Sequence, residues 1–408
     1  MLTKIKIKKA GLTAFIAMMQ FSELSNAQSV TIGGTPSDGP SAGFMSMFTG
    51  DLFTNFRHME RFAPVSTMTP SPNPWKLNPA PTKINFQGNF LGQQITLEEF
   101  LEISNTSSFL ILKNGELLFE EYRHGDSKTT THVSFSVAKS FVSTLIGIAL
   151  EEKLIANLSD PIKKYLPELD SEAFEDVTIK HVLQMSSGVR FDETYTDPNS
   201  DINKMGLLVM EMSYLEYINT LQREHEPGTY NHYASINTQL LGILLARITG
   251  RSLTEYMVEK FWHPLGMENP GHWVLDEQGY ELAMGGMSAS ARDYAKLGLL
   301  FLNKGTRGNA KIISSEWISE ATTPTESHLL PGNNTQSSNT AGYQYQWWTP
   351  RNWDDDFLAR GIWGQTIYIH PKNQVVIVKL AADQKNFDPK IKLAYIDYLQ
   401  ELGQSLVN

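Results

Sequence analysis

The sequence contains no cysteine. This excludes disulfide frameworks, thiolate metal sites and a lipid attached through a cysteine thiol. A His-Glu-x-x-His metal motif and a glycine-rich phosphate loop before a helix are also missing. No Gly-x-Ser-x-Gly motif is present either, since the nearest segment, Gly286–Ser290, lacks the final glycine. We therefore expect an activity that needs no metal and no other cofactor.

Positive charge is also scarce. Lys and Arg number 34 against 44 Asp and Glu, so the formal net charge is −10. No basic stripe interleaved with aromatic residues is present, and an acidic chain repels a polyanion. We therefore expect no nucleic-acid partner and look for a small-molecule substrate. The sequence gives no indication of the oligomeric state.

The first 27 residues have the pattern of a bacterial signal peptide. Four lysines come first, a mostly apolar stretch follows over 10–21, and small residues at 25–27 end the segment. A membrane-spanning helix needs about 20 apolar residues, and this stretch is shorter. We predict cleavage after Ala27, a secreted or periplasmic location and no stable membrane anchor. The mature chain would carry a net charge of −13, because the removed segment holds four lysines and one glutamate.

The rest of the chain divides by composition into an extended arm rich in proline and glycine over 28–95 and one domain over 96–408. Strands are predicted near both ends of this domain, and they include a hairpin at Asn114-Gly115. Helical periodicity dominates between them, with a mostly helical lobe at roughly 155–285. The expected fold is α/β of the α+β type, in which helices flank an antiparallel sheet and the site lies in a cleft between sheet and lobe.

The segment Ser136-Val-Ala-Lys139 is the main candidate for chemistry. Apolar residues at helical spacing over 135–151 place Ser136 in the first turn of a buried helix and Lys139 one turn further along the same face. A serine hydroxyl needs a neighbouring base to act as a nucleophile, and a helix N-terminus offers free N–H groups. An ordinary amphipathic helix is the alternative. An unpaired ammonium in an apolar helix would be costly, which favours a catalytic lysine.

Tyr233 is the candidate for a third proton-carrying group. It lies on a loop that follows the turn Pro227-Gly228 and precedes a predicted helix. A cationic amine close to the phenol would stabilise the phenolate and lower the tyrosine pKa. The alternative is an aromatic side chain that only packs against the start of the helix.

Several motifs in this order resemble the serine β-lactamase-like hydrolases over roughly 105–385. They are Ser136-x-x-Lys139, Asp160-Pro161, Ser186-Ser-Gly188, Pro227-Gly-Thr229 with Tyr233, Gly285-Gly-Met-Ser288, and the segment 361–380. Within this family the chain looks like the class C β-lactamase branch, and most like the 6-aminohexanoate-dimer hydrolase type.

The resemblance implies an acyl-enzyme mechanism. Ser136 would be acylated, while Lys139 and Tyr233 would share the role of base, and the sequence leaves open which of them removes the serine proton. The backbone N–H groups of Ser136 and Gln365 would form the oxyanion hole. Such donors typically contribute about 3 kcal/mol each to lowering the barrier.

Two departures from the family pattern bear on the substrate. Ser235 stands where β-lactamases carry an asparagine, and Ile362-Trp363 replaces the Lys-Thr pair that meets the substrate carboxylate. Ser235-Ile-Asn237 can alternatively be the Ser-x-Asn motif of other penicillin-recognising enzymes. We predict that Ser235, Trp363 and Gly364 contact the substrate, with the indole favouring apolar or aromatic groups.

The sequence therefore predicts an exported serine hydrolase that cleaves amide or ester bonds of small substrates. One alternative keeps the fold and makes the protein a class C-type β-lactamase, which the Ile362-Trp363 replacement argues against. A second alternative is a non-catalytic binding or sensor module. The presence of Ser136, Lys139 and Tyr233 together argues against it, because a binding role does not require all three.

Overall fold

The computed structural model describes residues 46–208, 212–276 and 278–407. The predicted signal peptide and the first part of the predicted arm lie outside these ranges. The described part of the arm contains the helix α3 (Leu52–Arg57) and the strands β1 (Val65–Met68) and β2 (Asn78–Pro79).

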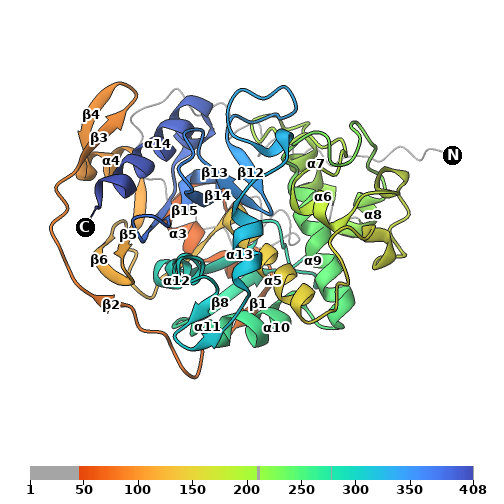
Figure 1. Ribbon diagram of the computed structural model, residues 1–408, viewed down its shortest axis with the longest axis horizontal. Helices are drawn as coiled ribbons and strands as arrows, with labels where there is room; N and C mark the ends of the chain where they lie inside the picture. Colours follow the sequence, from red (N-terminus) through yellow and green to blue (C-terminus); the bar gives the residue numbers. More distant parts are fainter. Residues whose placement is uncertain (1–45, 209–211, 277, 408) are drawn as a thin grey trace.

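An eight-stranded sheet forms the centre of the main body (Figure 1). All its pairings are antiparallel except the pairing of β2 with β6 at one edge. β5, from the start of the domain, pairs with β16 from its end, which confirms the predicted antiparallel sheet. In spatial order the strands are β12 (Gly342–Gln344), β13 (Trp347–Thr349), β14 (Phe357–Gly361), β15 (Gln365–His370), β16 (Val375–Ala381), β5 (Thr106–Lys113), β6 (Glu116–Tyr122) and β2.

The sheet separates two apolar cores because successive side chains of a strand point to opposite faces. Leu110 and Leu112 of β5 belong to the larger core, whereas Phe109 and Ile111 belong to the smaller one. The helix α12 (Ala291–Leu302) packs against β16, β15 and β5 on the larger-core face. The helices α4 (Leu97–Ile103) and α14 (Pro389–Ser405) cover the other face (Figure 1).

The helical lobe lies beside the β12 edge of the sheet (Figure 1). Its centre is the pair α5 (Ala138–Glu151) and α9 (Ser235–Thr249), which pack on each other. The other helices here are α6 (Ile179–Leu183), α7 (Asp201–Leu208), α8 (Tyr214–Ile218), α10 (Leu253–Met257) and α11 (His263–Leu265). A second sheet, in the order β1-β8-β9-β7, includes β8 (Gly271–Val274), β9 (Met287–Ser290) and β7 (Thr131–Val133).

The remaining elements are the hairpin β3 (Gln87–Phe90) and β4 (Gln93–Thr96), the pair β10 (Thr306–Arg307) and β11 (Ala310–Lys311), and α13 (Ser315–Thr322). From sequence, residues 343–348 resemble a single strand, but they belong to two strands, β12 and β13. The two are joined at Tyr345 and Gln346, whose φ angles are +30° and +69°. Neither residue is glycine, so the sequence carried no turn signal there.

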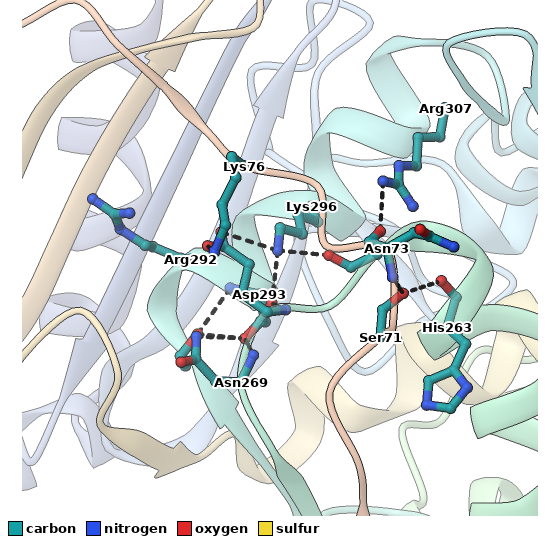
Figure 2. A network of polar contacts seen from close by, with 12 residues as sticks. Ser71, Asn73, Lys76, His263, Asn269, Arg292, Asp293, Lys296 and Arg307 are labelled. Carbon is teal, nitrogen blue, oxygen red and sulfur yellow. Dashed lines mark hydrogen bonds and ion pairs between the residues drawn. The ribbon is translucent and has the colours of Figure 1, made fainter.

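A buried polar network attaches the arm to the main body (Figure 2). The carboxylate of Asp293, in the first turn of α12, accepts hydrogen bonds from the backbone N–H groups of Glu268 and Asn269 at 2.7 and 3.1 Å. Lys296 donates to the same carboxylate at 2.9 Å, and both charged side chains are fully buried. Lys76 of the arm pairs with Glu268 at 2.9 Å. The arm is therefore bound through charged groups as well as through its strands.

Candidate active site

Ser136 lies at the N-terminal end of α5, in a single 3-10 turn, Phe135–Val137, that precedes the helix. Its N–H is one of those that lack an intrahelical acceptor at a helix start. Phe135 has a φ of +46°, a strained value for a bulky residue, and such strain is found where the surroundings fix a functional geometry. Gly361 passes so close that an added Cβ would lie 2.3 Å from the carbonyl oxygen of Ser134. At this sharp turn Ser136 is half-exposed, whereas Phe135 and Val137 on either side of it are buried.

Lys139 is within hydrogen-bonding distance of Ser136, as predicted. Its Nζ donates to Ser136 Oγ at 3.1 Å and to the carbonyl oxygen of Met284 at 2.5 Å. The side chain is only 1 % exposed, and no carboxylate of the described residues forms an ion pair with it. Burial lowers the pKa of Lys139 from 10.5 to about 7, and the charge of Glu193 opposes this only in part. A large fraction of the amine is therefore neutral at neutral pH and able to accept a proton.

Tyr233 joins the pair from the loop before α9. Its ring centroid is 5.4 Å from Lys139 Nζ, and the ring stacks on Trp348 at 5.2 Å. Burial raises the pKa of Tyr233, Glu193 raises it further, and a hydrogen bond with Ser136 opposes the rise. The expected lowering of this pKa by a cationic amine is therefore outweighed by desolvation of the phenol and by the charge of Glu193. At neutral pH Tyr233 is a proton donor.

Glu193 is a site residue that the sequence analysis did not identify. The Ser235 N–H and hydroxyl both donate to its carboxylate, at 2.8 and 2.5 Å, and the Tyr195 hydroxyl donates to it at 2.6 Å. Its charge also acts on Lys139 and Tyr233. Ser235, predicted to contact the substrate, thus lies at the site with its hydroxyl already engaged. That prediction is not tested by this contact.

The loop before β15, which carries the predicted oxyanion donor Gln365, is held at three consecutive carbonyl groups. Ile362 O accepts from Gln365 Nε2 at 3.2 Å, Trp363 O from the Asp383 N–H at 3.0 Å, and Gly364 O from Lys379 Nζ at 3.3 Å. Because a peptide unit is planar and trans, a fixed Gly364 carbonyl also fixes the opposite direction of the Gln365 N–H. Preorganised donors of this kind stabilise developing negative charge.

Trp363 lies in a cluster of aromatic rings. Its ring stacks on Phe48 with centroids 6.0 Å apart and meets Phe56 and Phe387 edge-on at 5.6 and 5.1 Å. The residue is 6 % exposed, so little of the indole is free for a ligand. Its contact with the substrate, and that of Gly364, remain predictions.

Lys379, fully buried on β16, gives a first test of this loop. Burial lowers its pKa to about 8, so replacing it with methionine removes little that stabilises the fold. We expect Lys379→Met to lower kcat by about tenfold or more with a smaller change in KM, because the Gln365 N–H loses its fixed direction. Steady-state kinetics on an ester substrate measures this effect. The matched variant Lys113→Met, on the neighbouring strand, should leave kcat unchanged, and equal losses in both variants would contradict the assignment.

The arrangement offers little to a metal ion. In the ranges 46–208, 212–276 and 278–407, no three His, Asp or Glu side chains are grouped so that they could bind one. No helix within those ranges is both apolar enough and long enough to cross a membrane.

Comparisons with known proteins agree with this geometry. The 6-aminohexanoate-dimer hydrolase of Paenarthrobacter ureafaciens is 28 % identical over 295 residues, covering 70 % of this chain and 75 % of that protein. A solved structure from Bacillus anthracis, described as a presumed 6-aminohexanoate-dimer hydrolase, superposes with a TM-score of 0.79 at 25 % identity and covers 88 % of this chain and 96 % of the other. EstCE1, described as a hydrolase with promiscuous acyltransferase activity, shares the fold at a TM-score of 0.60 and 14 % identity, over 76 % and 96 % of the two chains.

The model of the Beta-lactamase family matches residues 103–400, which include every catalytic residue predicted from the sequence. The predicted serine β-lactamase-like fold is thereby confirmed. This chain belongs to the Beta-lactamase family.

Proposed function

We propose that the protein is an exported serine hydrolase that cleaves amide or ester bonds of small substrates through an acyl-enzyme on Ser136. The observation that carries the proposal is the 3.1 Å contact between Ser136 Oγ and a buried lysine whose pKa is lowered to about 7. A hydroxyl next to an amine of which a large fraction is neutral at neutral pH has a base that can activate it as a nucleophile. The relative named as a 6-aminohexanoate-dimer hydrolase supports an amide as one such bond, because an amide joins the two units of that dimer. Export rests on the signal-peptide pattern of residues 1–27.

In the first half of the reaction, Ser136 Oγ attacks the carbonyl carbon and its proton passes to Lys139 Nζ. The carbonyl oxygen gains negative charge, which the N–H groups of Ser136 and Gln365 would stabilise. Tyr233 gives its proton to the departing nitrogen or oxygen as the old bond breaks, and Lys139 returns a proton to Tyr233. Water then attacks the acyl-enzyme, with the same groups acting in reverse, and releases the acid.

A panel of substrates tests the proposal. The purified protein is incubated with a fluorophosphonate probe, neutral p-nitrophenyl esters, the linear dimer of 6-aminohexanoate and a chromogenic cephalosporin. We expect the probe to label Ser136 and the protein to turn over an ester or the amide. Turnover confined to the cephalosporin would replace the proposal with the β-lactamase alternative. A folded sample with neither label nor turnover would leave the binding-module alternative.

The pH dependence of kcat/KM tests which group removes the serine proton. Lys139 acts as a base only when deprotonated, so the rate should rise with pH through an apparent pKa of about 7 and then level off. Tyr233→Phe should keep this rising limb but lower the plateau by a factor of about 10² or more, because the proton donor to the leaving group is lost. The measurement is a pH–rate profile on a neutral ester. A rate that keeps rising beyond about pH 9 would contradict a base with a pKa of about 7 and would favour Tyr233, whose pKa is raised, as the group that removes the serine proton.

A further inference from the structure

Arg360 is a second cationic residue near Tyr233, and the mechanism does not use it. It lies on β14, next to Gly361, and strand alternation places it on the same face as Leu358, in the smaller core. Its guanidinium carbon is 4.9 Å from the centroid of the Trp348 ring, and the Tyr233 ring stacks on that same indole. Arg360 is also close enough to Tyr233 for its charge to oppose the rise in the phenol pKa. One indole therefore contacts both Arg360 and the catalytic phenol.

No carboxylate neutralises this arginine. Within the described ranges, neither a hydrogen bond nor an ion pair to an acidic group is formed by Arg360, although seven other arginines are paired in this way. Arg360 is half-buried, and the interaction with Trp348 is electrostatically weaker than an ion pair. Burial lowers its pKa to about 10, which shows that its charge is poorly solvated.

A second cation, Lys392 on α14, lies close enough to Arg360 to be affected by its charge. Lys392 is also half-buried and has no carboxylate partner in the part of the chain that the structure describes. Burial and the charge of Arg360 together lower its pKa to about 8. Two poorly solvated cations that repel each other, in a chain with a net charge of −10, favour an anion between or beside them.

We propose that Arg360, assisted by Lys392, binds a free carboxylate of the substrate, so that the preferred amides or esters are those that carry one. The inference rests on the proposed hydrolase function and names its substrate class. A guanidinium presents a planar set of N–H donors that matches a carboxylate in two parallel hydrogen bonds. Arg360 lies two positions before the Ile362-Trp363 pair in the sequence, so it does not occupy the position of the family's Lys-Thr pair. Arg360 would take over a charge that the replaced Lys-Thr pair cannot supply.

Matched substrates test the proposal on both sides of the scissile bond. For the acyl side, p-nitrophenyl hydrogen glutarate is compared with p-nitrophenyl butyrate, and for the leaving group, the linear 6-aminohexanoate dimer is compared with its C-terminal amide. The readout is the ratio of kcat/KM for the charged over the neutral member. We expect a ratio of about 10 or more in at least one pair, and a fall of about tenfold in Arg360→Gln, since a charged hydrogen bond is lost. Arg360→Lys should retain part of the preference.

Two further variants keep the test decisive. Lys392→Gln should weaken the same ratio, even if Arg360→Gln does not fold. Arg351→Gln removes an arginine that pairs with Asp397 and should leave the ratio unchanged. A wild-type ratio near one in both pairs, or a ratio that Arg360→Gln does not alter, would overturn the proposal.

Inhibition of the wild-type protein distinguishes a site for the substrate carboxylate from a site that binds any small anion. Glutarate should compete with the neutral ester, whereas glutaramide should not, and chloride or phosphate at the same ionic strength should have no effect. Inhibition by every anion alike would mean a general anion site and would overturn the substrate assignment. If the protein hydrolyses nothing, the hydrolase proposal fails, and binding of glutarate but not glutaramide in a thermal shift still decides on the carboxylate site.

Discussion

Ser136→Ala is expected to lower kcat/KM for ester and amide substrates by at least about 10³-fold, because no other group can form the acyl-enzyme. The free energy of unfolding should change little. Ser136 is half-exposed, and among the described residues the hydroxyl that is removed interacts only with Lys139 and Tyr233. Hydrolysis kinetics, labelling by a fluorophosphonate and chemical denaturation measure the two effects separately.

Ser143→Ala is the matched control. Ser143 lies on the same helix, α5, and its buried hydroxyl has no hydrogen-bond partner among the described residues. Its removal should therefore affect neither activity nor stability. If Ser136→Ala instead kept its activity, or lost several kcal/mol of stability with it, Ser136 would be a structural residue and the proposed mechanism would be wrong.

Asp293→Ala should produce the largest loss of stability. The carboxylate is fully buried, and its removal deprives Lys296 Nζ of a partner at 2.9 Å and two backbone N–H groups of their acceptor. Breaking a buried pair by deleting one member typically costs about 3–5 kcal/mol. Lys296 keeps Glu268 as a partner at 3.2 Å, so the two backbone N–H groups that lose their acceptor account for much of the expected loss. Urea or guanidinium unfolding measures the change.

A surface ion pair provides the comparison for Asp293. Asp354 pairs with Lys372 where both side chains are well exposed. Asp354→Ala should cost no more than about 1 kcal/mol, since water screens such pairs. Similar losses in the two variants would show that the polar network of Figure 2 does not stabilise the fold as argued.

Local signals allowed much of the fold to be predicted from the sequence. The capping box at Thr96 and Glu99, a pattern visible in the sequence, begins α4. Ser290 caps α12, and Asn114-Gly115 joins β5 to β6 as predicted. In each case the residues that determine the structure are neighbours in sequence.

The parts of the site that could not be predicted depend on contacts between distant segments. Glu193 becomes a site residue only because its loop meets the start of α9, 42 positions later in the chain. The three groups that donate hydrogen bonds to the loop before β15 come from β15, β16 and the segment at Asp383. No sequence pattern links these three groups. The direction of the Tyr233 pKa shift was missed for the same reason, since it depends on desolvation by the whole lobe.

The packing of the arm has a consequence for how much of the chain can be removed. Phe48 and Phe56 pack on Trp363, and both also pack on Phe135, the strained residue before Ser136. The arm thus packs against the turn that carries Ser136 and, through Trp363, against the loop before β15. If a protease cuts between the arm and the domain and the arm then dissociates, the core helices and strands would stay in place, but both segments would lose this packing. Limited proteolysis should therefore abolish hydrolysis at a stage when circular dichroism still reports a folded protein.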